Sequence, residues 1–111
     1  MLSHAWTLDE GPHRDAYVAL TDEFEQFHRR QRGFRGRRLV RDATDARHFL
    51  NLRYWDHLED YERMVADPEY PEWIARLSAH VEPRDPQKQV FVVELDHPDP
   101  TGAPATHRGA R

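Results

Sequence analysis

The spacing of apolar side chains changes once within the first thirty residues. Residues 2–8 alternate, with Leu2, His4, Trp6 and Leu8 on one face, which predicts a short first strand. The run Asp9-Glu10-Gly11-Pro12 then indicates a turn. From residue 13 to residue 31 the large apolar side chains recur every three or four positions, at Tyr17, Leu20, Phe24 and Phe27. This spacing predicts an amphipathic helix over 13–31.

The middle of the chain is typical of a hairpin of two strands. Residues 34–41 (FRGRRLVR) and 47–55 (RHFLNLRYW) have the composition of strands, and the polar residues 42–45 separate them.

Two further helical segments and a last strand follow the hairpin. The first helix opens near Asp56 and ends at Asp67-Pro68. The second begins near Pro71 and ends before Pro83, and its apolar positions are Tyr70, Ile74, Leu77 and Val81. Residues 89–95 (QVFVVEL) are expected to form the last strand.

This order of elements predicts an α+β fold. It is the split βαβ arrangement of a ferredoxin-like domain, with a four-stranded antiparallel sheet. We expect the domain to span residues 1–96. Residues 97–111 have no periodicity and no large apolar side chain, so a disordered C-terminal tail is expected there.

Two of the predicted strands are apolar on both faces. In 89–95, Val90 and Val92 oppose Phe91, Val93 and Leu95; in 47–55, Leu50, Leu52 and Tyr54 oppose Phe49 and Trp55. The helices can cover one face of the sheet only. An uncovered apolar face of several hundred Å² is unfavourable in water, so we expect a homodimer joined through the sheet faces.

Composition narrows the possible functions. The 111 residues carry a formal net charge of −4 and no cysteine. The charge argues against a general nucleic-acid binder and against a polybasic membrane protein. The absence of cysteine excludes disulfides, thiolate nucleophiles and Cys-based metal sites. No apolar run is long enough for a membrane helix, and the first residues show no signal peptide, so a cytoplasmic protein is expected.

Four segments, taken in order, resemble a known family. They are Gly33-Phe34-Arg35-Gly36, Leu39-Val40-Arg41-Asp42, Phe49-Leu50-Asn51-Leu52 and Trp55-Asp56-His57-Leu58-Glu59-Asp60-Tyr61. This series resembles the antibiotic biosynthesis monooxygenase family, and the resemblance covers about residues 4–96. It implies a dimeric α+β barrel. The family also contains haem-degrading enzymes and members without known activity.

The resemblance also implies a set of site residues. Members that oxidise aromatic polyketides have an Asn and a Trp four apart on the third strand and a Tyr six beyond the Trp, which here are Asn51, Trp55 and Tyr61. Arg76 is the counterpart of their helical Arg. Because Asn51 and Trp55 are an even number apart, both are expected to point to one face of the sheet. Four further side chains are expected to bind the substrate: Trp6, His48, Trp73 and His80.

The chemistry implied is oxidation of a phenol or anthrone to a quinone by O₂, without a cofactor or a metal. The chain has no glycine-rich dinucleotide fingerprint, and its eight histidines are dispersed. The competing hypothesis is a non-catalytic ligand-binding or structural member of the same fold, in which Trp55 and Tyr61 are core aromatics and Arg76 is solvated. Haem binding or degradation ranks lower, because Met64 and Ile74 fall where haem-degrading members need a Trp and a ligating His.

An arginine-rich stretch remains open to two interpretations. Residues 29–41 hold seven arginines and no acid. They suit anion binding, but a solvated, charged edge strand explains them more simply.

Overall fold

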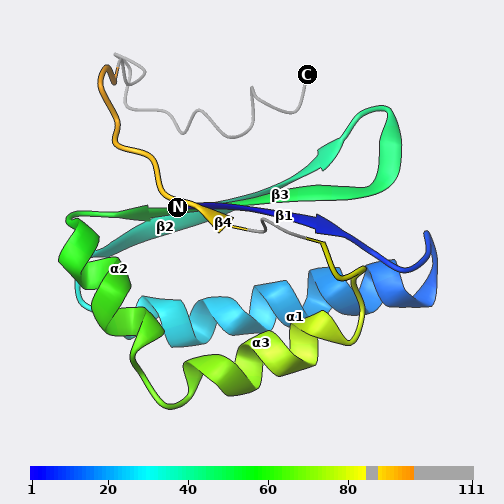
Figure 1. The fold of residues 1–111 in the computed structure, drawn as a ribbon, viewed down its shortest axis with the longest axis horizontal. Coiled ribbons are helices and arrows are strands. Elements are labelled where there is room, and N and C mark those ends of the chain that lie inside the picture. The colour runs from blue at the N-terminus through cyan, green and yellow to red at the C-terminus, as the bar shows by residue number, and fades with distance from the viewer. Residues whose placement is uncertain (85–87, 97–111) are drawn as a thin grey trace.

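The protein folds as one antiparallel sheet covered on one side by three helices (Figure 1). The computed structural model describes residues 1–84 and 88–96, and the expected tail 97–111 lies outside them. The elements are β1 (Leu2–Trp6), α1 (Pro12–Arg29), β2 (Phe34–Asp42), β3 (Asp45–Trp55), α2 (Leu58–Val65), α3 (Tyr70–Ser78) and β4 (Lys88–Gln89). The strand order is β2-β3-β1-β4. The predicted ferredoxin-like α+β fold is therefore confirmed.

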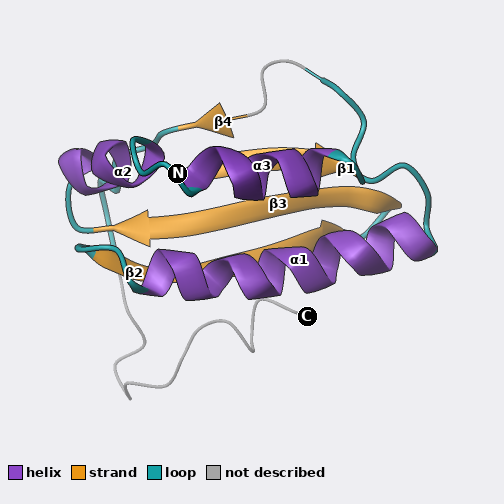
Figure 2. Ribbon diagram, turned by 90° about the horizontal axis from the view of Figure 1, so that it is seen from below, coloured by secondary structure: helices purple, strands orange, loops and turns teal. Residues whose placement is uncertain are grey.

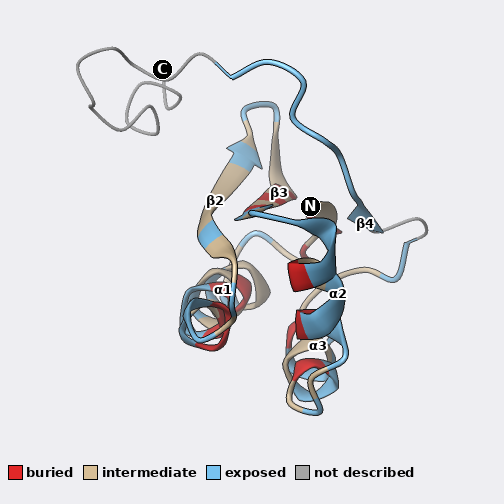
Figure 3. Ribbon diagram, turned by 90° about the vertical axis from the view of Figure 1, so that its left-hand side faces the viewer, coloured by how far each residue is buried: buried red, intermediate tan, exposed pale blue. Residues whose placement is uncertain are grey.

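α1 and α3 lie side by side beneath the sheet, and α2 lies beyond one end of α3 (Figures 2 and 3). The apolar faces of the helices form the core with β3. Tyr17, Phe24 and Phe27 are buried as the predicted stripe of α1, and Tyr70 and Leu77 as that of α3. Of the helices in the described ranges, none is long and apolar enough to cross a membrane.

Gly33 sets the direction in which the chain enters the hairpin. Its φ is +82°, and a Cβ at this position would come within 2.0 Å of Asp60 Oδ2. The carboxylate of Asp60, which is buried and pairs with Arg63 at 2.9 Å, occupies the space that a side chain would need. Residue 33 therefore has to be glycine for α2 to pack against the start of β2.

The arginine-rich stretch lies on the last turn of α1 and on β2, which is an edge strand. Several of its guanidinium groups pair with carboxylates of the helices and loops: Arg29 with Glu25, Arg30 with Glu69, Arg35 with Asp56, and Arg37 with Asp22 and Glu25. These pairs fit the interpretation of a charged edge strand.

The predicted strand over 89–95 is wrong in its extent. Only Lys88 and Gln89 pair with β1, where they face Ser3 and Leu2. The antiparallel register carries the chain past Met1 after residue 90, so β1 offers no further partner. Residues 90–95 therefore leave the sheet on the side opposite the helices (Figure 1), and their apolar side chains are exposed, with Val92 at 83 %.

Candidate functional site

A row of four side chains on β3 faces the helices. Phe49, Asn51, Arg53 and Trp55 alternate inward, as the pairing of Ala5 with Phe49 and of Ser3 with Asn51 requires. Asn51 is 2 % exposed and Arg53 is 5 % exposed. Asn51 and Trp55 point to one face of the sheet, as their spacing predicts, and the structure shows that this face looks toward the helices.

A cavity of about 550 Å³ lies beneath β1 and β3, and we call it the central cavity. It exists because β1 turns its small side chains, Ser3 and Ala5, toward the helices. Its polar lining includes Asn51, Arg53 and Tyr70, and its apolar lining comes from Tyr17, Phe24, Ile74, Leu77 and Val81. A cavity with apolar walls and a few convergent polar groups is typical of a small-molecule site.

Two polar atoms of residues that line the central cavity lack a partner among the described residues. Asn51 Oδ1 and Arg53 Nε are fully buried and make no hydrogen bond within the part of the chain that the structure describes. Buried polar groups are nearly always paired in folded proteins. Two such atoms, two residues apart on one strand, indicate a place where a ligand completes the hydrogen bonding.

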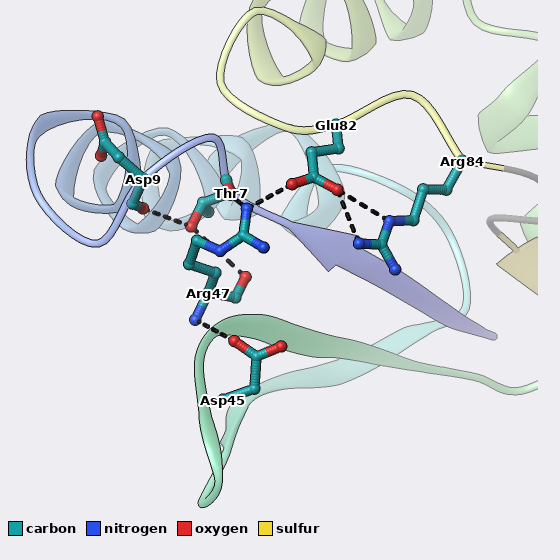
Figure 4. Close-up of polar contacts among 6 residues, drawn as sticks. All are labelled: Thr7, Asp9, Asp45, Arg47, Glu82 and Arg84. Atoms are coloured by element: carbon teal, nitrogen blue, oxygen red, sulfur yellow. Dashed lines mark hydrogen bonds and ion pairs between the residues drawn. The ribbon is translucent and has the colours of Figure 1, made fainter.

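The mouth of the central cavity is held by a polar cluster between β1, β3 and the residues after α3 (Figure 4). Arg47 donates to the backbone oxygen of Thr7 at 3.0 Å and forms an ion pair with Glu82, which also accepts from Arg84 at 2.7 Å. Glu82 N–H donates to the oxygen of Trp6 at 2.7 Å. These contacts tie residues 81–84 to the end of β1. Glu82 and Arg84 line the cavity there.

A second cavity, of about 620 Å³, lies at the other end of the row and is called the tryptophan cavity below. Trp55 and Tyr61 line it, with their rings 6.4 Å apart and edge to face. Trp55 Nε1 is buried and has no partner among the described residues. The exposed side chains Val90, Phe91, Val92 and Val93 form part of its wall. Arg53 lines both cavities and so lies at their junction.

Burial controls the charge states around this junction. Burial lowers the pKa of Arg53 to about 10, which leaves the guanidinium charged at neutral pH. Burial raises the pKa of Tyr61 and of Tyr70, so both phenols stay protonated. Lys88 Nζ donates to the Tyr70 hydroxyl oxygen, which leaves the Tyr70 proton free to be donated to another group. Beside the ion-paired Glu82, the lining of the central cavity thus carries the cations Arg53 and Lys88 and the hydroxyl donor of Tyr70.

Three of the predicted site residues on α3 and just beyond it do not line either cavity. Arg76 is on the surface, where it pairs with Glu23 at 3.4 Å and lies 4.6 Å from the centre of the Trp73 ring. Trp73 donates from Nε1 to Glu69 at 2.9 Å. His80 Nδ1 lies 2.9 Å from His13 Nδ1. The structure does not bring Arg76 together with Asn51.

Trp6 and His48 lie on the opposite, open face of the sheet. Their rings stack with centroids 4.3 Å apart. His48 also joins a polar chain: its Nδ1 is 3.0 Å from Asp42 Oδ2 and its Nε2 is 3.0 Å from His4 Nδ1. The hydrogen bond from His48 is the largest of the contributions that lower the pKa of Asp42 to about 2. Of this cluster, Trp6, His48 and Asp42 line neither cavity, whereas His4 lines the central cavity.

Sequence analysis missed Arg53 and Tyr70 as site residues. The alternation in β3 contained the signal for Arg53, because position 53 shares the inward face with Asn51 and Trp55. A charged residue at a position expected to be buried is a candidate functional group. Tyr70 gave no such signal, because its place in the apolar stripe of α3 is equally well explained by packing.

The comparisons with known proteins agree with this fold. The family described as antibiotic biosynthesis monooxygenase matches residues 10–76. SnoaB from Streptomyces nogalater, a cofactor-independent oxygenase, is a similar solved structure (16 % identity, 88 % of this chain and 94 % of that chain covered, TM-score 0.74).

Two other solved structures are similar. One is an antibiotic biosynthesis monooxygenase (17 % identity, 86 % and 96 % covered, TM-score 0.68). The other is Rv0793 from Mycobacterium tuberculosis (16 % identity, 88 % and 96 % covered, TM-score 0.66). No curated protein matches the chain. At these identities the structural likeness is one of fold, whereas the family match spans more than half of the chain. The chain belongs to the antibiotic biosynthesis monooxygenase family.

Proposed function

We propose that the protein is a cofactor-independent monooxygenase that oxidises an aromatic, polyketide-type phenol or anthrone to a quinone with O₂. The observation that carries the proposal is the row Asn51, Arg53 and Trp55, which lines two cavities and holds three buried polar atoms without a partner among the described residues, in a chain of this family. SnoaB, which shares the fold, is a cofactor-independent oxygenase. We expect the reaction to take place in the cytoplasm.

The electrons in this reaction come from the substrate. An anthrone loses a proton from its methylene carbon, and the resulting enolate gives one electron to O₂. The two radicals combine into a peroxide at that carbon, and loss of water leaves a carbonyl group. One oxygen atom enters the quinone and the other leaves as water. The protein's task is to hold the ring, favour the enolate and exclude bulk water.

Three side chains receive roles in this proposal. The Asn51 amide contacts a substrate oxygen, Trp55 provides an aromatic surface for the ring, and the neutral Tyr61 phenol donates a hydrogen bond to a carbonyl group. Arg76 has no role, because it lies on the surface beside Glu23.

Replacing Asn51 with alanine tests the proposal. We expect Asn51→Ala to slow the oxidation of 1,8-dihydroxyanthrone by on the order of tenfold, because the hydrogen bond that positions a substrate hydroxyl group on Asn51 Oδ1 is lost. The measurement follows quinone absorbance together with O₂ uptake, corrected for the oxidation that occurs without protein. Glu72→Gln, an exposed site on α3, is the matched control and should keep the wild-type rate.

The outcome also separates the competing hypotheses. A folded wild-type protein that does not accelerate O₂ uptake, but binds the corresponding quinone, would support a non-catalytic ligand-binding member. Equal rates in the wild type, Asn51→Ala and Trp55→Phe would remove the proposed site.

We also propose that the active form is a homodimer that joins the open sheet faces. Leu2, Val40, Leu50 and Leu52 lie on this face, which has no helix over it (Figure 1). Residues 90–95 run past the end of β1 with exposed apolar side chains and unpaired backbone groups, which a strand of a second copy can satisfy.

Replacing Val92 with aspartate tests this dimer. We expect the wild type to sediment at twice the mass of one chain at micromolar concentration. Val92→Asp should weaken self-association by about tenfold or more, because it places a charge in the interface. Leu8→Asp, at an apolar side chain that is 45 % exposed beyond the other end of β1, should leave the association unchanged. A wild type that sediments as one chain would contradict the dimer.

A further inference from the structure

Arg53 is a buried cation without an anion. It is 5 % exposed, and no carboxylate within the described ranges forms an ion pair with it. Its guanidinium carbon lies 5.1 Å from the centre of the Phe24 ring, and its fully buried Nε makes no hydrogen bond there. Burying a charge without a partner is strongly unfavourable. The buried guanidinium of Arg53 therefore needs another group that compensates its charge.

The side chains around Arg53 supply only part of that compensation. The phenols of Tyr17, Tyr61 and Tyr70 interact favourably with its charge, but a phenol is a weaker partner for a guanidinium than a carboxylate is. Its cross-strand neighbour Arg37 is itself positive, although Arg37 pairs with Asp22 and Glu25. Arg53 lines both cavities. Of the other charged groups on the central cavity, Lys88 and Arg84 are positive, and the carboxylate of Glu82 is paired with Arg47 and Arg84.

The partners that the ligand must bring follow from these unpartnered groups. Arg53 requires an acceptor, and a negatively charged oxygen is the strongest acceptor for a guanidinium. Asn51 Oδ1, two residues away on the same face, requires a donor such as a hydroxyl group. The aromatic walls select a flat ring between these two contacts.

We propose that the central cavity binds its aromatic ligand as an anion. An ionised ring oxygen of the ligand contacts the Arg53 guanidinium, and a neighbouring hydroxyl group contacts Asn51. The aromatic nature of the ligand rests on the proposed function. The charge on the ligand rests on Arg53, with Lys88 as a second cation on the lining of the central cavity. Arg53 therefore selects substrates that carry an acidic phenol, and it holds them in the electron-rich form that reacts with O₂.

The experiment uses 2-hydroxyanthraquinone, whose single hydroxyl group changes colour when it ionises. This probe is already a quinone, so its binding does not depend on turnover. A spectrophotometric pH titration in the presence of excess protein gives the pKa of the bound hydroxyl. We expect the wild type to lower this pKa by about one pH unit or more relative to the free probe. 2-Methoxyanthraquinone, which cannot ionise, should bind at least tenfold more weakly.

Variants assign the effect to Arg53. Arg53→Met should abolish the decrease, and Arg53→Lys should retain part of it because the charge stays. Arg37→Met removes a charge from the adjacent strand, outside the cavity. This variant should retain most of the decrease in the pKa of the bound probe. Circular dichroism confirms that each variant is folded.

Three results would overturn the inference: a wild type that does not bind the probe, a bound pKa that is unchanged or raised, or an equal decrease in Arg53→Met. A lowered bound pKa in a protein that oxidises no anthrone would leave this inference intact and remove the oxygenase function.

Discussion

Replacing Arg53 with methionine is expected to make the protein more stable and far less active. The guanidinium is buried with no carboxylate partner in the described part of the chain, so the folded state pays the cost of desolvating it. Methionine fills a similar volume without that cost. We expect the free energy of unfolding in urea to rise by about 1–3 kcal/mol. The rate of anthrone oxidation should fall by about 100-fold, since a charge aimed at the developing oxyanion is lost.

Replacing Arg37, the neighbour of Arg53 on β2, is expected to make the protein less stable. Arg37 has a side chain that is 9 % exposed and pairs with Asp22 and Glu25. Arg37→Met therefore leaves Asp22 without its cation and Glu25 with Arg29 alone. It should lower the free energy of unfolding, with little effect on the rate. If Arg53→Met proves less stable than the wild type, the premise that the folded protein leaves the charge of Arg53 uncompensated is refuted.

Mild acid is expected to destabilise the protein through His28. This side chain is 1 % exposed and surrounded by the rings of Phe24, Phe27, Phe34 and Trp55. Its Nδ1–H donates to the Phe24 oxygen at 3.0 Å, and Nε2 has no partner among the described residues. Burial, followed by the nearby charge of Arg53, lowers the pKa of His28 from 6.5 to about 3.

The direction of this pH dependence follows from whether the folded or the unfolded chain binds the proton of His28 more readily. Below pH 6.5 the unfolded chain protonates this histidine, whereas the folded protein does so only near pH 3. The stability that neutral His28 contributes is therefore complete above pH 6.5 and is lost as the pH falls toward 3. The loss between pH 6.5 and 4.5 amounts to about 2 kcal/mol, at about 1.4 kcal/mol for each full pH unit.

Urea unfolding at pH 6.5, 5.5 and 4.5 measures this dependence. His28→Gln keeps a donor for the Phe24 oxygen and cannot titrate, so its stability should be nearly constant over the same range. His57→Gln, at an exposed position before α2, should retain the wild-type slope. Equal slopes in the wild type and His28→Gln would show that other groups cause the acid sensitivity.

Most of the fold could be predicted because its elements are set by local patterns. The stripe through Tyr17, Phe24 and Phe27 required a helix, and the run 47–55 required a strand. The last strand failed because its length depends on a distant segment. Residues 89–95 have every local property of a strand, but pairing ends where β1 begins, at Leu2.

The site could be predicted only where one strand determines the geometry. The even spacing of Asn51 and Trp55 fixed their shared face, which the structure confirms. The face of Trp6 was not fixed in this way, because it depends on the register that sets Trp6 opposite His48. Hydrophobicity favoured turning Trp6 inward, whereas β1 turns Ser3 and Ala5 inward and leaves room for the cavity. Arg76 is next to the buried Leu77 on α3. A shift of one residue in the helical register therefore decides whether the side chain at this position points into the site or to the surface.

The position of Met1 has a practical consequence for preparing the protein. Its amino group donates to the Arg53 oxygen at 2.9 Å, and its own oxygen accepts from Arg53 N–H at 2.9 Å. An affinity tag fused ahead of Met1 would prolong β1 alongside residues 90–95 and offer them a partner within the same chain. Purification handles therefore belong at the other terminus, or should be cleaved before self-association or catalysis is assayed.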